Sequence, residues 1–235
     1  MLKQTIDIVL PCYNPQPKWY TELLHFHERA KENYTIRYIL VNDGSVNAEL
    51  EKALPVLKSE GIDVTYISYP ENKGKGYALR QGVKASKNEY VIYTDIDFPF
   101  TNNSVMDVID KILGGGSDVV AGNRDAMYYR NKMSFFRKLL SKSFRFILKH
   151  LLRMKVTDTQ CGLKAFNAKG KEEFLKTRIN RYLFDFEFIY RCGKNNSIRI
   201  TPEAVELKPN VEFSKMKLKI LVQETFNLFK VILFS

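Results

Sequence analysis

The chain has 235 residues, of which 45% are hydrophobic and 13% aromatic, so it can bury a sizeable core and is too apolar for a disordered protein. Its net charge is +11. Residues 1–120 carry 13 basic and 16 acidic side chains, whereas residues 121–235 carry 24 and 10. The second half is therefore expected to face something anionic: nucleic acid, phosphate or a membrane surface.

The chain has three cysteines, an odd number, and they are not spaced like metal ligands. A disulfide framework or a zinc site is therefore not expected. We interpret them as reduced thiols of a cytosolic protein. A strand-like run begins close to Met1, so a signal peptide is not expected. Residues 218–234 are hydrophobic but are not expected to span a bilayer, because polar residues interrupt them: Lys219, Gln223, Glu224, Asn227 and Lys230. The sequence thus predicts a soluble or peripheral protein.

Short β-rich runs alternate with helical stretches in the first half. The expected strands are Ile6–Leu10, Ile36–Val41, Ile62–Tyr69, Tyr90–Thr94 and Asp118–Ala121, and the expected helices lie near Lys18–Lys31, Ala48–Ser59, Tyr77–Ser86 and Ser104–Leu113. The strands are nearly continuous apolar runs, which indicates burial on both faces of a mostly parallel sheet. This order predicts a doubly wound α/β fold, in which ligands bind beyond the carboxyl ends of the strands.

Polar residues follow all five expected strands. These ends are Pro11–Asn14, Asn42–Ser45, Asn72–Gly76, Asp95–Asp97 and Gly122–Arg124. Each one alone is more readily explained as a turn or a loop. Five of them at one edge of a sheet favour a binding site.

Asp95 and Asp97 are the strongest single signal. Two residues apart in an extended strand end, their side chains would point to the same side. Paired carboxylates suit a hard divalent cation whose other ligands are phosphate and water, and such a cation would neutralise a departing diphosphate.

The neighbouring strand ends carry groups that suit a nucleotide. Asp43 is a candidate to accept hydrogen bonds from a base or ribose, and Tyr13 is a candidate stacking surface. The loop 72–76 offers backbone N–H groups with Lys73 and Lys75 at a helix start, which predicts a cradle for an anion. It is not a Walker loop, so ATP hydrolysis is disfavoured.

Residues 126–157 contain nine Lys and Arg residues and no Asp or Glu. Their apolar residues, Phe135 and Phe136 among them, follow helical spacing with the basic residues on another face. We favour a helix at an anionic lipid surface over a core-packing helix with a solvated basic face. Residues 215–234 form a similar, weaker amphipathic segment.

Together these motifs resemble the family 2 glycosyltransferases of the GT-A fold, which use a nucleotide-sugar donor. Within them, the second half is similar to polyprenyl-phosphate glycosyltransferases, first the dolichyl-phosphate glucosyltransferases and then the dolichol-phosphate mannose synthases. This similarity is carried by Gly122–Arg124, by the run Asp158–Lys164 (Asp-Thr-Gln-Cys-Gly-Leu-Lys) and by Phe184–Glu187. The sequence departs from the family pattern at Asn42, where an Asp is usual, and at Pro15, where a Glu is usual.

The resemblance implies an inverting transfer of a hexose from a nucleoside diphosphate sugar to a polyprenyl or dolichyl phosphate, with Mg²⁺ or Mn²⁺ as cofactor. It implies a single GT-A domain over residues 1–235, with a nucleotide-sugar half (about 1–124) and an acceptor and membrane half (about 125–235) at the cytoplasmic face of a membrane. The residues it assigns to the donor are Pro11, Tyr13, Asn14, Asp43, Lys73, Lys75 and Asp95. It assigns metal binding to Asp95 and Asp97. It assigns binding of the acceptor phosphate to Arg124, Arg137 and Ser141. The catalytic residues it implies are Asp97, Asp158, Asp185 and Glu187.

Acceptor chemistry separates the alternatives. A phosphate monoester has a second pKa of about 6 and is already ionised at neutral pH, so it needs positioning by arginines more than a general base. A sugar hydroxyl would need a base, for which Asp158 and Asp185 are candidates. Asp185 and Glu187 have the equal alternative of pairing with nearby basic residues. A nucleic-acid binder is disfavoured, because the basic helix lacks aromatic side chains interleaved for base stacking.

Overall fold

The structure is a computed structural model that describes residues 3–124, 156, 158–181, 183–209 and 211. Its strands are β1 (Gln4–Cys12), β2 (Tyr34–Asp43), β3 (Asp63–Tyr69), β4 (Tyr90–Tyr93), β5 (Val119–Arg124), β6 (Lys164–Phe166) and β7 (Ile200–Val205). Its helices are α1 (Tyr20–Ala30), α2 (Glu49–Ser59), α3 (Lys75–Ala85), α4 (Asn102–Leu113), α7 (Ala168–Leu175) and α8 (Phe184–Lys194). The two amphipathic helices expected from the sequence lie outside the described residues, apart from Val156.

The seven strands form one sheet in the order β3-β2-β1-β4-β6-β5-β7. All neighbouring pairs are parallel except those of β6, which runs antiparallel to both β4 and β5. The expected mostly parallel sheet is therefore confirmed. Strands from both halves of the sequence share it, because β5 pairs with β6 and β7.

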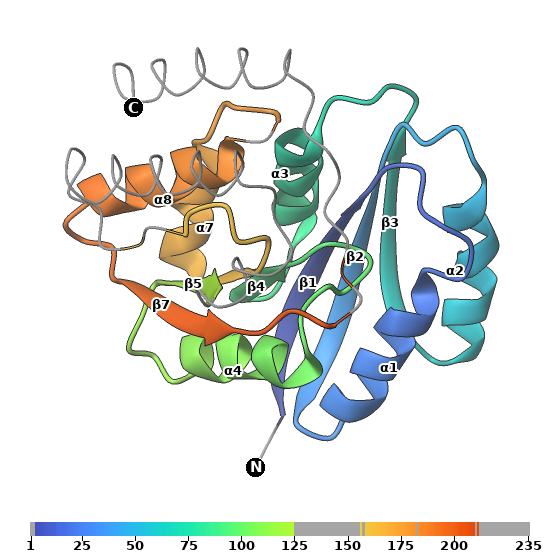
Figure 1. Cartoon of the computed structure of the whole chain (residues 1–235), viewed down its shortest axis with the longest axis horizontal. Coiled ribbons are helices and arrows are strands. Elements are labelled where there is room, and N and C mark those ends of the chain that lie inside the picture. Colours follow the sequence, from blue (N-terminus) through green and yellow to red (C-terminus); the bar gives the residue numbers. More distant parts are fainter. Residues whose placement is uncertain (1–2, 125–155, 157, 182, 210, 212–235) are drawn as a thin grey trace.

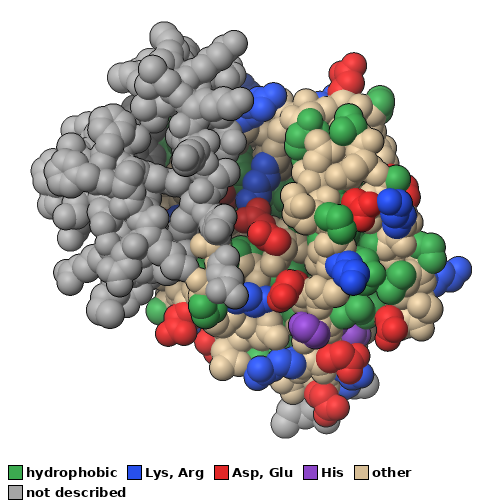
Figure 2. All heavy atoms as spheres, turned by 45° about the vertical axis from the view of Figure 1, so that its right-hand side comes forward, with side chains coloured by type: hydrophobic (Ala, Val, Ile, Leu, Met, Phe, Trp, Pro, Cys, Tyr) green, Lys and Arg blue, Asp and Glu red, His purple; other side chains and the backbone are tan. Residues whose placement is uncertain are grey.

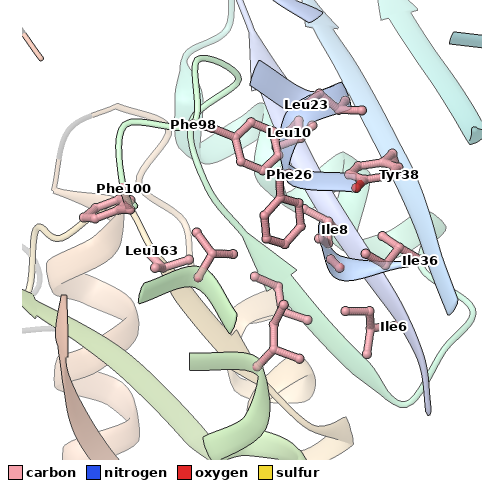
Figure 3. Packing of buried hydrophobic residues seen from close by; sticks show 14 of the residues in the cluster. Ile6, Ile8, Leu10, Leu23, Phe26, Ile36, Tyr38, Phe98, Phe100 and Leu163 are labelled. Atoms are coloured by element: carbon pink, nitrogen blue, oxygen red, sulfur yellow. The ribbon is translucent and has the colours of Figure 1, made fainter. Parts of the chain in front are cut away.

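Helices cover both faces of the sheet (Figure 1). One core joins the sheet to α1, α2 and α4, and a second core joins it to α3, α7 and α8. Along β1 the buried side chains alternate between the two cores: Ile8 and Leu10 belong to the first, and Val9 to the second. Figure 3 shows Ile6, Ile8 and Leu10 of the first core beside Phe26 of α1. Burial on both faces explains why the strands are continuous apolar runs.

Gly82 allows helix α3 to pack directly against the sheet. A Cβ atom at this position would lie 2.3 Å from Val9 Cγ1 and 3.0 Å from Val41 Cγ2. A side chain there would push α3 away from β1 and β2. This glycine thus helps to set the distance of α3 from the sheet, and Lys75 is the first residue of this helix.

Candidate functional site

The turn after β4 holds Asp95 and Asp97. The strand ends at Tyr93, so the two carboxylates belong to a turn and not to the extended strand end that the sequence analysis assumed. Phe98 N donates to Asp95 O at 3.0 Å. Phe98 has a φ of 44°, a backbone conformation that residues other than glycine rarely adopt. The fully buried Phe98 ring stacks on Phe26 with 5.3 Å between ring centroids (Figure 3). Core packing therefore holds this turn in a strained shape.

Lys75 lies against this turn. Its ammonium group forms an ion pair with Asp95 Oδ1, and both side chains are about one-third exposed, at 33% and 39%. A Cβ atom at Gly162 would lie 2.8 Å from Asp95 Oδ2 and 3.5 Å from Lys75 Nζ. The Asp158–Lys164 run thus passes beside the ion pair, and a side chain at position 162 would have to displace the Asp95 carboxylate.

Asp97 is the other carboxylate of the turn. Protein atoms around the carboxylate and the like charge of Asp95 raise the pKa of Asp97, against the opposing charges of Lys75 and Lys208. Among the described residues no cation is ion-paired with Asp97, and none of their His, Cys, Asp and Glu side chains form a ligand cluster of three or more. Asp95 and Asp97 fit a hard cation whose remaining oxygens come from a ligand.

Asp43 at the end of β2 accepts hydrogen bonds from the chain itself. It is buried, and its carboxylate accepts from the Tyr69 hydroxyl at 2.8 Å, the Asn72 amide at 3.0 Å, Lys73 N at 2.8 Å and Gly74 N at 2.9 Å. The base or ribose contact assigned to Asp43 stays a prediction. Its carboxylate demonstrably shapes the loop that precedes α3.

These contacts correct the expected anion cradle. The N–H groups of Lys73 and Gly74 already donate to Asp43, and Gly76 N donates to Asn180 O at 2.8 Å. The loop therefore offers fewer backbone donors to a ligand than the sequence suggests. Lys73 is exposed, and its ammonium group lies 5.1 Å from the centroid of the Tyr77 ring.

The end of β1 places one aromatic ring in solvent. Tyr13 is 52% exposed, as a stacking surface for a base would be, whereas Pro11 is buried in β1. Asn14 has a φ of 49° and joins this loop to the next: its N–H donates to Ser45 Oγ and its Oδ1 accepts from Val46 N, both at 2.9 Å.

The Asn42 departure has a local explanation. Its amide nitrogen donates to the Tyr66 hydroxyl at 3.0 Å and to Glu51 at 3.3 Å, while its oxygen accepts from Ser45 N at 2.8 Å. An aspartate here would face the Glu51 carboxylate without a proton to donate. At the other departure, Pro15 O accepts from the Asn47 amide at 3.1 Å.

Arg124 and Asp158 form a two-pronged ion pair at the end of β5. Arg124 Nε and Nη2 donate to the two Asp158 oxygens at 2.8 and 2.7 Å, and Arg124 N donates to the same carboxylate at 2.9 Å. The Asp158 side chain is only 5% exposed. These two residues were assigned to different tasks, acceptor binding and catalysis, and the fold makes them one unit. The other residues assigned to acceptor phosphate, Arg137 and Ser141, lie outside the described residues.

Asp185 in the first turn of α8 is paired inside the protein. Its Oδ1 accepts from the fully buried Lys164 ammonium at 2.8 Å and from the Tyr93 hydroxyl at 2.5 Å. Burial and the Asp185 charge raise the pKa of Tyr93. Of the two alternatives left open for Asp185, this geometry favours pairing with a basic residue.

Glu187, two residues after Asp185 in α8, also has hydrogen-bond partners within the chain. Its buried carboxylate accepts from the backbone N–H groups of Arg178, at 2.9 and 3.0 Å, and of Ile179, at 2.8 Å. Arg80 of α3 donates to Ile179 O at 2.8 Å. Glu187 and Arg80 therefore fix the segment that reaches the N-terminus of α3.

Three members of the site were not predicted from the sequence: Gly162, Lys164 and Tyr93. The first two belong to the Asp158–Lys164 run, from which only Asp158 was selected. Tyr93 lies in the expected strand Tyr90–Thr94, which was interpreted as a nearly continuous apolar run. A polar tip on a buried aromatic residue usually has a partner, and that was the one available signal.

Comparisons with known proteins agree with this architecture. The profile described as "Glycosyl transferase family 2" matches residues 7–174. The dolichyl-phosphate beta-glucosyltransferase of Drosophila melanogaster is 30% identical over 203 residues, which are 79% of this chain and 61% of the relative. That of Dictyostelium discoideum is 27% identical over 205 residues, 81% of this chain and 63% of the relative. The chain thus spans less than two-thirds of the length of either relative.

A solved structure shares the fold. Glucosyl-3-phosphoglycerate synthase from Mycobacterium tuberculosis, crystallised with Mn²⁺, UDP and glucosyl-3-phosphoglycerate, superposes with a TM-score of 0.65 at 17% identity, covering 98% of this chain and 79% of that one. The expected GT-A fold is confirmed. With the family profile matched over most of the sequence, the chain belongs to glycosyltransferase family 2.

Proposed function

We propose that this chain is an inverting glycosyltransferase that moves a hexose from a nucleoside diphosphate sugar to a polyprenyl or dolichyl phosphate. A UDP-glucose-like donor is preferred, with GDP-mannose as the second candidate. Relatives named dolichyl-phosphate beta-glucosyltransferase support the reaction and the sugar. The structural neighbour crystallised with UDP supports the base.

The observation that carries the proposal is the engagement of the base candidates. Asp158 is held by Arg124, Asp185 by Lys164 and Tyr93, and Glu187 by backbone N–H groups. A hydroxyl acceptor needs a carboxylate that is ready to take its proton. An ionised phosphate acceptor needs none, so the engagement of Asp158, Asp185 and Glu187 suits a phosphate better than a hydroxyl.

The donor end of the site is assigned to the turn after β4. Asp95 and Asp97 would hold Mg²⁺ or Mn²⁺, which, when bound, stabilises the negative charge of the departing diphosphate. The neighbour crystallised with Mn²⁺ supports a divalent ion. Tyr13, with half of its side chain exposed, supplies a surface on which a base stacks.

Arg124 is assigned to the acceptor phosphate. Asp158 orients its guanidinium group by a two-pronged ion pair, which reduces the freedom that phosphate binding would otherwise cost. Arg137 and Ser141 are i and i+4, and on a helix they share one face. Together the three residues would form a clamp of planar and hydroxyl donors for the lipid phosphate.

We further propose that the chain works at the cytoplasmic face of a membrane. None of the helices in the described ranges has the length and hydrophobicity of a bilayer span. The support comes from charge: Figure 2 shows acidic and basic side chains interspersed on the visible described surface, whereas residues 126–157 carry nine basic side chains and no acidic one. Anionic vesicles should therefore sediment the protein, and high salt should release it.

A transfer assay tests the reaction. Radiolabelled UDP-glucose and GDP-mannose are each offered with dolichyl phosphate or with soluble sugars, in Mn²⁺ or in excess chelator. We expect label from UDP-glucose to enter the lipid extract, and only when metal is present. Label in the soluble saccharide with none in the lipid would favour the second candidate function, transfer to a sugar hydroxyl in polysaccharide synthesis.

A further inference from the structure

The ion pair between Lys75 and Asp95 occupies one of the two carboxylates assigned to the metal. Lys75 is the first residue of α3, and the backbone around it is fixed: Gly74 N donates to Asp43, and Gly76 N donates to Asn180 O. The fold therefore fixes the backbone from which the Lys75 side chain reaches Asp95.

Three carboxylates, those of Asp95, Asp97 and Asp185, act electrostatically on this ammonium group. Asp95 forms the ion pair with it, whereas Asp185 already has a buried cation in Lys164 at 2.8 Å. The ion pair of Lys75 is therefore with the turn after β4.

A divalent cation at Asp95 would place two positive groups beside one carboxylate. Lys75 Nζ is close to Asp95 and to the backbone at Gly162, and the like charges repel at such separations. Metal binding at Asp95 would therefore disfavour the contact with Lys75. An ammonium group released from Asp95 would need another anion, and the phosphates of a bound donor would supply one.

We propose that Lys75 is a built-in counterion that competes with the metal for Asp95 and moves to the phosphates of the donor when metal and nucleotide bind together. This inference rests on the proposed metal role of Asp95 and Asp97. Its consequence is coupling: the metal binds weakly to the protein alone and tightly with the nucleotide, so that donor and metal enter as a pair.

The test measures Mn²⁺ binding by electron paramagnetic resonance of the free ion, with and without UDP, and requires no turnover. The wild-type protein is compared with Lys75→Met, which removes the charge at similar length, and with Lys75→Arg, which retains it. The matched control is Lys84→Met. Lys84 lies in the last turn of the same helix, is exposed, and is not among the residues assigned to the donor or the metal.

We expect UDP to tighten Mn²⁺ binding to the wild type by about tenfold, within the usual range of coupling between sites. Without UDP, Lys75→Met should bind Mn²⁺ about threefold to fivefold more tightly than wild type, the scale of a partly exposed ion pair. With UDP this advantage should disappear or reverse, so the coupling shrinks. Lys75→Arg and Lys84→Met should retain the wild-type coupling.

Unchanged or weaker Mn²⁺ binding by Lys75→Met without UDP would overturn the inference, as would an equal gain in Lys84→Met, which would indicate a general effect of surface charge. If the wild type binds no Mn²⁺ even with UDP, the metal site of the proposed function fails, and the inference fails with it. Tight Mn²⁺ binding with UDP and no effect of Lys75→Met would leave the proposed function standing and remove the inference alone.

Discussion

Replacing Asp185 separates a structural role from a catalytic one. Lys164 is fully buried, and its ammonium group is held by Asp185 Oδ1 at 2.8 Å and by Cys161 O at 2.5 Å. In Asp185→Leu the lysine charge keeps its burial and loses its counterion. Breaking a buried ion pair in this way costs about 3–5 kcal/mol, and the Tyr93 hydroxyl also loses its acceptor. We expect a loss of that size in the free energy of unfolding, measured by urea denaturation.

Removing the remaining partners should recover stability. Lys164→Met in the Asp185→Leu background removes the uncompensated charge, and adding Tyr93→Phe removes a buried hydroxyl whose unmet hydrogen bond costs about 1–3 kcal/mol. The triple variant should therefore be more stable than the single one. Apolar replacement of a buried ion pair is often neutral.

Transfer activity of the refolded triple variant decides between the roles. Activity within about tenfold of the wild type would identify Asp185 as a residue that positions α8. If instead Asp185→Asn loses less than about 1 kcal/mol of stability and abolishes transfer, the structural argument is refuted and Asp185 returns to being a base.

Three further predictions concern other carboxylates and their partners. Asp97→Asn should lose most transfer activity while its far-UV circular dichroism stays unchanged, and full activity in excess chelator would exclude the metal role. Arg124→Lys cannot make the two-pronged contact with Asp158, so acceptor efficiency should fall about tenfold to a hundredfold with donor affinity by calorimetry nearly unchanged; equal losses would move Arg124 to the diphosphate. Burial raises the pKa of Asp7, but Arg37 and two backbone N–H groups outweigh it and hold that pKa below 3.8. The ionised Asp7 therefore stabilises the folded state above pH 3.8, and this contribution is lost as the pH falls through the lower pKa of the folded protein. Urea unfolding of Asp7→Asn should therefore show a weaker dependence on pH in the acid range than the wild type, and an identical dependence would contradict the ion-pair account.

The first half of the fold could be predicted because its strands are long apolar runs between amphipathic helices. Periodicity is less informative for the described elements of the second half. Helix α8 buries every residue from Phe184 to Tyr190, the acidic Asp185 and Glu187 among them, so the acidic residues of its first turn do not mark a solvent-facing side. Strand β6 has three residues, and β7 contains Pro202, which argues against a strand in sequence-based reasoning.

The site was predictable as a set of residues and not as a set of contacts. Asp95 and Asp97 stand out by spacing alone. The partners of Asp43 lie 26 to 31 residues away along the chain, and Arg124 and Asp158 are 34 residues apart. Such pairs depend on which loops meet at the sheet edge, and this is decided by topology, including the antiparallel β6 that no local pattern indicated.

The charges at the sheet edge that holds Asp95 and Asp97 also bear on the inference that a divalent cation binds together with the nucleotide donor. Asp43, Asp158 and Asp185 are each neutralised or fully hydrogen-bonded by the chain. Asp95 shares the single charge of Lys75 with Asp97, and the pKa of Asp97 is raised. Two carboxylates and one ammonium leave about one negative charge, too little to hold a divalent ion firmly against that ammonium. Under the proposed function, a diphosphate would add the missing oxygens and charge, so the metal site would be complete only when the donor is present.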